Sequence, residues 1–295
     1  MRCEVDQMQV PGPFEYERAT SVDDAIGLLE RLGSEARLVA GGHSLLPMMK
    51  LRLANPEYLI DINPLHDELG HITVEPSGVR IGAMVRHREL LESAELAALW
   101  PIFRDAERVI ADPVVRNRGT IGGSLCQADP AEDLSTVCEV LDATCVLRGP
   151  GGERTIGMSE FHLGPYETAA ADDEILTEIR IPFRDHGSNA YAKVERRVGD
   201  WAIAAAGAAV WLDGPTIVEA RIGLTAVNAD RSGFGEVYEF LLGKPCTDEV
   251  ALYAGDLASR HCEPVTDMRG TAEYKRHLAK ELTRRALRTA AGRVH

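Results

Sequence analysis

The chain has 295 residues, of which 45% are apolar and 26% are charged, and its formal net charge is −14. The length suits about two domains of ~100–200 residues each, and the composition is that of a globular protein with a packed core. The negative charge argues against nucleic acid as the main partner, because phosphate binding needs a basic surface. The longest apolar run, residues 202–212, is shorter than the ~20 residues of a membrane span. The first residues, MRCEVDQMQVPGPF, lack the apolar core of a secretory signal, so we expect a cytoplasmic protein.

The cysteines do not form a recognisable metal or disulfide pattern. They are Cys3, Cys126, Cys138, Cys145, Cys246 and Cys262, and no two of them form a C-x-x-C pair. Zinc and iron–sulfur sites usually have closely spaced cysteines, so no metal ligand is predicted on this chain. We interpret the cysteines as small buried apolar residues, since a disulfide framework is not expected without secretion.

The first half of the chain alternates helical and strand patterns. Ser21 is a capping residue for a helix over residues 21–32, Asp24 is placed to reach back, and apolar residues recur on one helix face. Further along, the sequence predicts strands over residues 36–40 and 58–62, a hairpin of residues 72–75 and 79–82, and a helix over residues 87–99.

The second half is richer in strand signals. The patterns predict a hairpin of residues 144–147 and 154–156, a strand over 174–182 that stops at a proline, and strands over 190–197, 202–212 and 218–227. Propensity alone favours a helix for the alanine-rich stretch 202–212, but strand-like neighbours and the following turn at Asp213-Gly214-Pro215 favour a strand. A closing helix is predicted over residues 271–291, and a domain boundary near residue 182.

Two adjacent glycines interrupt the chain between a predicted strand and a predicted helix, in the sequence Ala40-Gly41-Gly42-His43-Ser44. Ser44 stands at an N-cap position, and free N–H groups at such a place favour an anion. The spacing matches neither G-x-G-x-x-G nor G-x-x-x-x-G-K-[ST], so this segment alone fits a plain loop better. No base or nucleophile pairs with His43, which we interpret as a binding residue, and no catalytic residue is predicted.

A second glycine cluster changes this interpretation. It consists of Gly119, Thr120, Ile121, Gly122, Gly123 and Ser124. The hydroxyl groups and the N–H groups of the glycines are expected to form a second concave donor surface. Two such surfaces in one domain suit a ligand with two linked phosphates.

A helix start is predicted directly after this cluster. Asp129, Pro130 and Glu132 have the pattern of a cap, a first helical residue and a capping box. That pattern accounts for Asp129 but explains Asp133 less well. Asp133 is therefore predicted to be free to hydrogen-bond a ligand hydroxyl.

Together the two glycine motifs resemble the flavin-binding medium subunits of the molybdenum hydroxylases, and most closely those of aerobic carbon monoxide dehydrogenases. The resemblance covers nearly the whole chain and rests on five stretches: AGGHSLLPMMKLRL, GTIGGSLCQADPAEDL, GPYETAAADDEILTEIRIP, KVERRVGDWAIAAAGAAV and TAEYKRHLAKELTRRAL. One departure is Gln127, where relatives often have histidine. Only the residues before Gln9 look like an extension without a counterpart.

The resemblance implies an α+β fold related to vanillyl-alcohol oxidase (the PCMH type) that binds FAD. It implies an N-terminal FAD-binding subdomain over residues 1–62, a central one over 63–182, and a small C-terminal α+β domain over 183–295 with an antiparallel sheet and helices. The two glycine motifs would wrap the FAD pyrophosphate, and Asp133 would contact the flavin. Lys193, Trp201 and Leu176 would lie near the ring, with core packing as an equal alternative for Trp201.

The implied function is electron transfer. A large subunit with a molybdenum cofactor would oxidise the substrate, a small subunit would carry electrons through iron–sulfur clusters, and this chain's FAD would deliver them to an external acceptor such as quinone. A dimer of heterotrimers, a heterohexamer, is expected, with any membrane association only through its partners. CO is the expected substrate. The alternatives are a related complex acting on a purine, aldehyde or N-heterocycle, an independent FAD-dependent oxidoreductase, and an assembly module without flavin.

Overall fold

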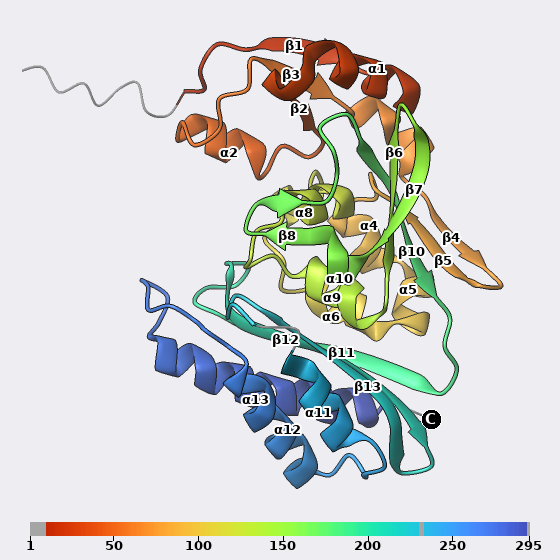
Figure 1. Ribbon diagram of the computed structural model, residues 1–295, viewed down its shortest axis with the longest axis vertical. Coiled ribbons are helices and arrows are strands. Elements are labelled where there is room, and N and C mark those ends of the chain that lie inside the picture. Colours follow the sequence, from red (N-terminus) through yellow and green to blue (C-terminus); the bar gives the residue numbers. More distant parts are fainter. Residues whose placement is uncertain (1–9, 230–232, 294–295) are drawn as a thin grey trace, which may run out of the picture. The chain divides into compact units, whose positions relative to one another are not determined.

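The computed structural model of the chain describes residues 10–229 and 233–293, which form two compact units (Figure 1). The units are built from interleaved stretches of the chain. Among the described residues, the N-terminal unit comprises 10–87, 113–127 and 144–180, and the C-terminal unit comprises 88–112, 128–143, 181–229 and 233–293. Cys3 and the expected extension before Gln9 lie outside the described residues. The three domains expected from the resemblance remain a prediction.

A small parallel sheet begins the N-terminal unit. Its strands are β1 (Glu15–Arg18), β2 (Ala36–Val39) and β3 (Tyr58–Asp61), in the order β1-β3-β2, with β3 parallel to both neighbours. The helical elements connected to it are α1 (Val22–Leu32), η1 (Gly33–Glu35), α2 (Leu45–Lys50), η2 (Asn63–Leu65) and α3 (His66–Leu69).

The cap of α1 follows the predicted chemistry. Ser21 is in an extended conformation, and its hydroxyl accepts a hydrogen bond from the Asp24 backbone N–H at 3.0 Å. The Asp24 carboxylate reaches back to the backbone N–H of Thr20 at 2.8 Å. These two hydrogen bonds hold the first turn of the helix in place. The apolar face of the helix packs in one hydrophobic core with residues of the parallel sheet.

A five-stranded sheet completes the N-terminal unit, in the order β4-β5-β10-β6-β7. Its strands are β4 (Ile72–Glu75), β5 (Gly78–Gly82), β6 (Thr144–Gly149), β7 (Gly152–Gly157) and β10 (Ile175–Pro182). Both predicted hairpins are confirmed. The remaining elements of this unit are α7 (Pro113–Arg116), α8 (Ile121–Gln127), α10 (Met158–Phe161), β8 (His162–Gly164) and β9 (Glu167–Thr168).

The C-terminal unit is centred on a three-stranded antiparallel sheet. Its strands are β11 (Gly187–Glu195), β12 (Ala202–Asp213) and β13 (Thr216–Thr225). The helices of this unit are α5 (Ala94–Leu99), α6 (Pro101–Glu107), α9 (Leu134–Val140), α11 (Phe234–Leu241), α12 (Asp248–Arg260) and α13 (Ala272–Ala291), together with α4 (His87–Glu92), which starts where the two units join along the chain.

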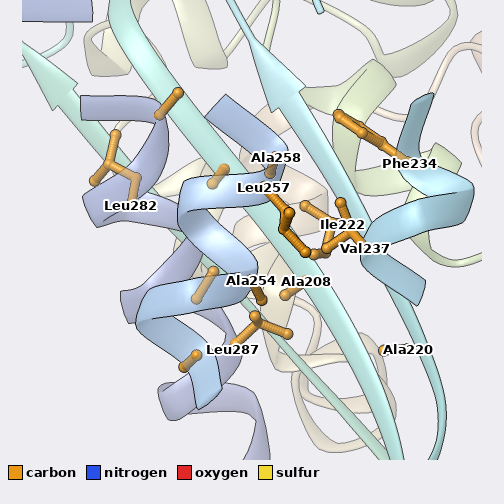
Figure 2. Close-up of a cluster of buried hydrophobic side chains, with 14 of the residues drawn as sticks. Ala208, Ala220, Ile222, Phe234, Val237, Ala254, Leu257, Ala258, Leu282 and Leu287 are labelled. Atoms are coloured by element: carbon orange, nitrogen blue, oxygen red, sulfur yellow. The ribbon is translucent and has the colours of Figure 1, made fainter. Parts of the chain in front are cut away.

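The alanine-rich stretch is the central strand β12, as predicted, and the structure explains its composition. Residues 202–210 are all buried, so the strand does not alternate between apolar and polar positions. On one face α11, α12 and α13 pack over the small side chains (Figures 1 and 2). On the other face α9 approaches so closely that a Cβ on Gly207 would lie 3.0 Å from the methyl group of Thr136. Small residues let both layers of helices reach the sheet.

Three predictions about local structure were wrong. The helix expected over 87–99 is interrupted at Ser93, whose hydroxyl accepts from the Leu96 N–H and caps α5. Cys126 is exposed, whereas the other four described cysteines are buried. The helix expected to start at Asp129 begins only at Leu134, because a different carboxylate provides its cap.

Within the described residues, no helix has the length and apolar character needed to cross a bilayer.

The contact between α12 and α13 offers a test of the packing. A Cβ added to Gly255 on α12 would lie 2.2 Å from the Lys280 backbone oxygen on α13, so Gly255→Ala must push the helices apart. We expect a loss of about 1–3 kcal/mol in the free energy of unfolding, measured by urea denaturation. Gly235→Ala on α11, where nothing lies within 4 Å, is the matched control and should leave stability unchanged or raise it by up to ~1 kcal/mol. Equal stability of the two variants would contradict this account of the helix contact.

Candidate functional site

The first glycine segment, residues 40–44, leaves β2 and leads into α2. Gly42 has φ 78°, a left-handed conformation that favours glycine. Gly41 is required for a different reason. A Cβ there would lie 2.4 Å from the Arg118 backbone oxygen and 2.7 Å from the Gly119 Cα. The backbones of the two glycine motifs are therefore in direct contact at this point.

The second glycine segment, residues 119–124, is also glycine-rich for reasons of packing. A Cβ on Gly119 would lie 2.7 Å from the ring of His87, and one on Gly122 would lie 2.7 Å from the Ala83 backbone oxygen. The missing side chains make room for other parts of the protein. A donor surface for a ligand, which was the predicted reason for these glycines, is therefore an incomplete explanation.

The backbone N–H groups of the second segment are not bare, which corrects the expectation of a second donor surface. Residues 121–127 form α8, and the first N–H groups of this helix have partners within the protein. The hydrogen bonds run from Ile121 N–H to Val85 O (3.0 Å), Gly122 N–H to Ala83 O (2.9 Å), Gly123 N–H to Thr120 Oγ1 (3.0 Å) and Ser124 N–H to Thr120 O (3.0 Å). Of the donors in this segment, the Gly123 backbone is exposed, the Ser124 hydroxyl belongs to a half-buried residue and the Thr120 hydroxyl to a buried one.

The first segment does keep free donors. Among the described residues, none accepts a hydrogen bond from the backbone N–H groups of Gly41, Gly42, His43 and Ser44. Ser44 occupies the N-cap of α2, but its hydroxyl makes no capping bond, and the His43 side chain is exposed. Four successive unsatisfied N–H groups form a site suited to an anion.

Asn63 joins the two segments, and sequence reasoning missed it. Its side-chain N–H groups donate to the Ala40 backbone oxygen and to the Asp61 carboxylate, each at 2.6 Å. Its side-chain oxygen accepts from Arg86 at 2.9 Å and from Arg118 at 3.2 Å. Nothing in the local sequence, an Asn-Pro after a strand, distinguishes this residue from an ordinary turn.

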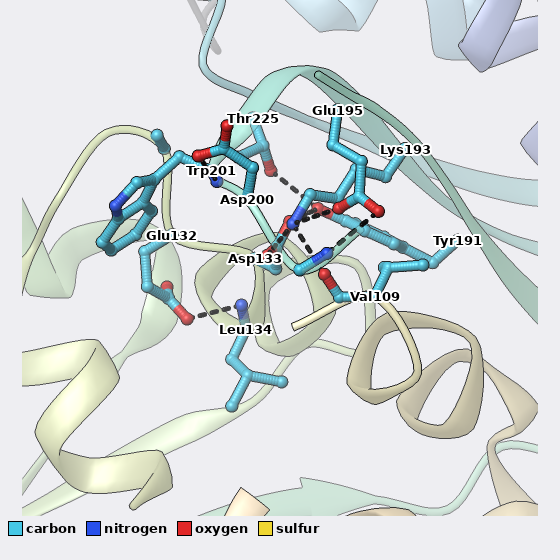
Figure 3. Close-up of polar contacts among 12 residues, drawn as sticks. Val109, Glu132, Asp133, Leu134, Tyr191, Lys193, Glu195, Asp200, Trp201 and Thr225 are labelled. Atoms are coloured by element: carbon cyan, nitrogen blue, oxygen red, sulfur yellow. Dashed lines mark hydrogen bonds and ion pairs between the residues drawn. The ribbon is translucent and has the colours of Figure 1, made fainter. Parts of the chain in front are cut away.

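Asp133 lies in the C-terminal unit and is engaged by the protein itself (Figure 3). The residue is 5% exposed. One carboxylate oxygen accepts from the Tyr191 hydroxyl at 2.6 Å, and the other accepts from Lys193 Nζ at 2.8 Å. Burial raises the pKa of Asp133, and the charge of Lys193 opposes that rise. Asp133 was expected to be free to hydrogen-bond a ligand hydroxyl, but both of its carboxylate oxygens already have partners within the protein.

Lys193 is the centre of this buried network. Its side chain is 1% exposed. Besides the bond to Asp133, its ammonium group donates to the Val109 backbone oxygen at 3.0 Å and forms an ion pair with Glu195 at 3.6 Å. Two of the three N–H bonds of the ammonium group therefore have hydrogen-bond acceptors, whereas the buried Glu195 Oε2 has no hydrogen-bond partner among the described residues. Lys193 therefore connects β11 to the start of α9 and to the loop after α6.

Glu132 caps α9 instead of Asp129. Its two carboxylate oxygens accept from the Leu134 N–H at 2.6 Å and the Ser135 N–H at 2.8 Å. Asp129 forms a tight turn in which its carboxylate accepts from the Ala131 N–H at 2.9 Å. Proline at 130 is thus part of a turn, and the helix starts four residues after it. Burial raises the pKa of Glu132 to about 7.

The two remaining predicted positions differ in exposure. Trp201 precedes β12 and is 43% exposed, which excludes the alternative that it packs in the core. Leu176 is buried in β10. Within the described residues, no group of three or more His, Cys, Asp or Glu side chains is placed to hold a metal ion.

The predicted site residues form two sets. The N-terminal unit brings together both glycine segments and contains Leu176, and the C-terminal unit brings Asp133 against Lys193 and contains Trp201. Each set is held by contacts within its own unit.

The buried ion pair yields a prediction. Lys193→Met would leave the Asp133 carboxylate buried without its counter-charge, and we expect a loss of about 3–5 kcal/mol in the free energy of unfolding. Lys280→Met is the control, because Lys280 pairs with Asp256 at 2.8 Å with both side chains about one third exposed, and a solvent-accessible pair contributes under about 1 kcal/mol. Urea denaturation of both variants measures the difference, and equal losses would contradict the role of Lys193.

The raised pKa of Glu132 predicts a pH dependence. The folded state holds this proton more tightly than the unfolded chain, whose pKa is 4.5, so stability falls as pH rises from 4.5 to about 7. The fall amounts to about 3 kcal/mol. Glu132→Gln keeps an acceptor for the cap but has no proton to lose. Urea titrations at several pH values measure the free energy of unfolding of both chains. The value for the native chain minus that for the variant should decrease between pH 4.5 and about 7. A constant difference across this window would refute the assignment.

Comparison with known proteins places this architecture. Residues 12–184 match the model of the FAD binding domain in molybdopterin dehydrogenase, and residues 189–290 match that of the CO dehydrogenase flavoprotein C-terminal domain. The carbon monoxide dehydrogenase medium chain of Hydrogenophaga pseudoflava is 44% identical over 96% of this chain and 99% of its own length. The glyceraldehyde dehydrogenase medium chain of Sulfolobus acidocaldarius is 36% identical over 95% and 99%.

The fold agrees with these matches. A solved carbon monoxide dehydrogenase from Hydrogenophaga pseudoflava, which lacks the Mo-pyranopterin moiety of the molybdenum cofactor, contains a chain that superposes with a TM-score of 0.92 at 44% identity, covering 97% of this chain and 100% of that one. The α+β fold predicted from the resemblance is confirmed. The chain belongs to the family of FAD-binding medium chains of molybdopterin-dependent dehydrogenases.

Proposed function

We propose that this chain holds FAD and passes electrons within a molybdenum hydroxylase that oxidises CO to CO2. The observation that carries the FAD assignment is the row of four unsatisfied N–H groups in the first glycine segment, residues 41–44, next to the second segment. Neutral N–H donors directed at a charged oxygen contribute about 1.5–3 kcal/mol each. A dinucleotide supplies two linked phosphates, which match a site of this kind.

The chain's own residues divide the work of binding. In the N-terminal unit, residues 40–44 would donate N–H groups to the pyrophosphate, and residues 119–124 would contribute hydroxyls. The Thr120 oxygen already accepts from Gly123, so its O–H remains to donate. Ser124 lies 3.1 Å from the His87 ring nitrogen. In the C-terminal unit, Trp201, which is 43% exposed, would stack on the flavin.

The structure also suggests what Lys193 and Asp133 contribute. Because they satisfy each other in a buried pair, they would shape the wall of the flavin site and hold the start of α9. They would not exchange protons with a substrate. Leu176, buried in β10, would line the pocket of the flavin ring. Bound FAD would supply the ability to accept electrons singly and release them singly or in pairs.

Substrate oxidation is therefore assigned to another chain. We propose a large partner with a molybdenum cofactor, a small partner with iron–sulfur clusters, and a dimer of such heterotrimers. An external acceptor, most simply a quinone, would take the electrons from this chain in the cytoplasm. CO is favoured as substrate by the 44% identity to a carbon monoxide dehydrogenase medium chain, although a glyceraldehyde dehydrogenase medium chain has the same architecture at 36% identity.

Purification from the native host through a tag on this chain tests the proposal. We expect FAD in a fixed ratio to the chain, molybdenum and iron in the same size-exclusion peak, and CO-dependent reduction of a dye. A complex that oxidises an aldehyde, purine or N-heterocycle but not CO would retain the subunit role and overturn the substrate. A lone chain with flavin and its own substrate would indicate an independent oxidoreductase. A lone colourless chain would overturn the FAD assignment and leave an assembly module.

A further inference from the structure

Asn63 uses every hydrogen-bonding position of its side-chain amide. An asparagine amide has two N–H donors and an oxygen with two lone pairs. The donors are occupied by the Ala40 backbone oxygen and the Asp61 carboxylate, and the lone pairs by the guanidinium groups of Arg86 and Arg118. The orientation of the amide is thereby fixed, because a flipped amide would place its N–H groups against two cations and its oxygen against two acceptors.

These four bonds tie the two glycine segments together at side-chain level. Ala40 begins the first segment, and Arg118 immediately precedes the second. The Arg118 backbone oxygen also packs against Gly41 and accepts a hydrogen bond from Arg86. Asn63 thus binds the side chains of Arg86 and Arg118 next to the point where the Gly41 backbone contacts the Arg118 backbone.

Arg118 has donors to spare. The residue is exposed, and its bond to Asn63 at 3.2 Å involves one nitrogen of the guanidinium group. Across the described residues, no carboxylate pairs with this guanidinium. In a chain of net charge −14, a cation without a carboxylate partner beside four unsatisfied N–H groups is an unusual arrangement. A guanidinium group presents five N–H donors in a planar fork that matches the geometry of phosphate oxygens.

We infer that Arg118 is a charged contact for the diphosphate of FAD and that Asn63 is the positioning residue that directs it. The inference rests on the proposed binding of FAD and adds to it the cation that the glycine motifs themselves do not contain. The N–H groups of the first segment would bind phosphate oxygens as neutral donors. Arg118 would add charge, and Asn63 would keep that charge beside the N–H groups.

The test uses the complete complex after removal of its flavin, titrated with FAD, ADP and riboflavin. ADP carries the diphosphate without the flavin, and riboflavin carries the flavin without phosphate. We expect Arg118→Met to weaken the binding of FAD and ADP by about 10- to 100-fold and to leave the affinity for riboflavin unchanged. The dependence of FAD affinity on ionic strength should also be smaller in this variant. Arg118→Lys should recover part of the loss. Arg31→Met, which removes an exposed cation paired with Glu17 on α1, is the control and should match the native complex.

Variants of Asn63 test the positioning role. Asn63→Ala removes all four bonds, and Asn63→Asp keeps the acceptor for both arginines but loses the donors to Ala40 and Asp61. Each variant should bind FAD and ADP more weakly and bind riboflavin with unchanged affinity. Because Asn63 acts through Arg118, Asn63→Ala should cost much less affinity when Arg118→Met is already present.

Several results would overturn the inference. Equal losses for riboflavin and ADP would mean that these residues support the fold and do not contact the diphosphate. Unchanged ADP affinity in Arg118→Met would exclude the charged contact, and this exposed side chain is replaced without loss of core packing. Additive losses in the double variant would exclude positioning by Asn63. A native complex that fails to bind FAD would refute the proposed function itself, and the two failures are therefore distinguishable.

Discussion

The contact between Gly41 and the backbone at Arg118 and Gly119 is the constraint on which the candidate site depends. A Cβ at Gly41 would lie 2.4 Å from a carbonyl oxygen, a distance that side-chain rearrangement alone does not relieve. This contact holds a stretch of chain with unsatisfied N–H groups beside a second stretch whose N–H groups are satisfied. The two segments therefore play different roles, because the first provides donors and the second provides the surface against which they are held.

The C-terminal unit is organised by a different kind of interaction. There a buried ammonium group, Lys193, is surrounded by a carboxylate, a backbone oxygen and a second carboxylate. Such a group is costly to bury unless each of its N–H bonds has a partner. The network joins β11 to α9, and α9 in turn packs against the glycines of β12 and β13 through Thr136. The polar network and the alanine-rich strand are thus parts of one packing arrangement.

Much of the fold could be predicted from the sequence, because its signals are local. The cap at Ser21, the two hairpins and the strand at 202–212 follow from capping chemistry, turn residues and neighbouring patterns. The two glycine segments were expected to bind one ligand, and the structure brings their backbones into contact. The satisfied N–H groups of Ile121 and Gly122 were not predicted, because their acceptors, Val85 and Ala83, lie far away in the sequence. Asn63 was missed for the same reason.

Asp133 shows why matching a motif does not by itself reveal what a residue does. Its sequence neighbourhood offered a helix start at Asp129 and left Asp133 unexplained, which favoured a ligand contact. In the structure the cap comes from Glu132, and both oxygens of Asp133 are occupied by Tyr191 and Lys193. A carboxylate with two strong internal donors gains little from a further hydroxyl, and breaking either bond would leave a buried polar group unsatisfied. By the same reasoning, Arg118, a cation with donors to spare at a contact that other residues already hold in place, is better suited to meet a ligand.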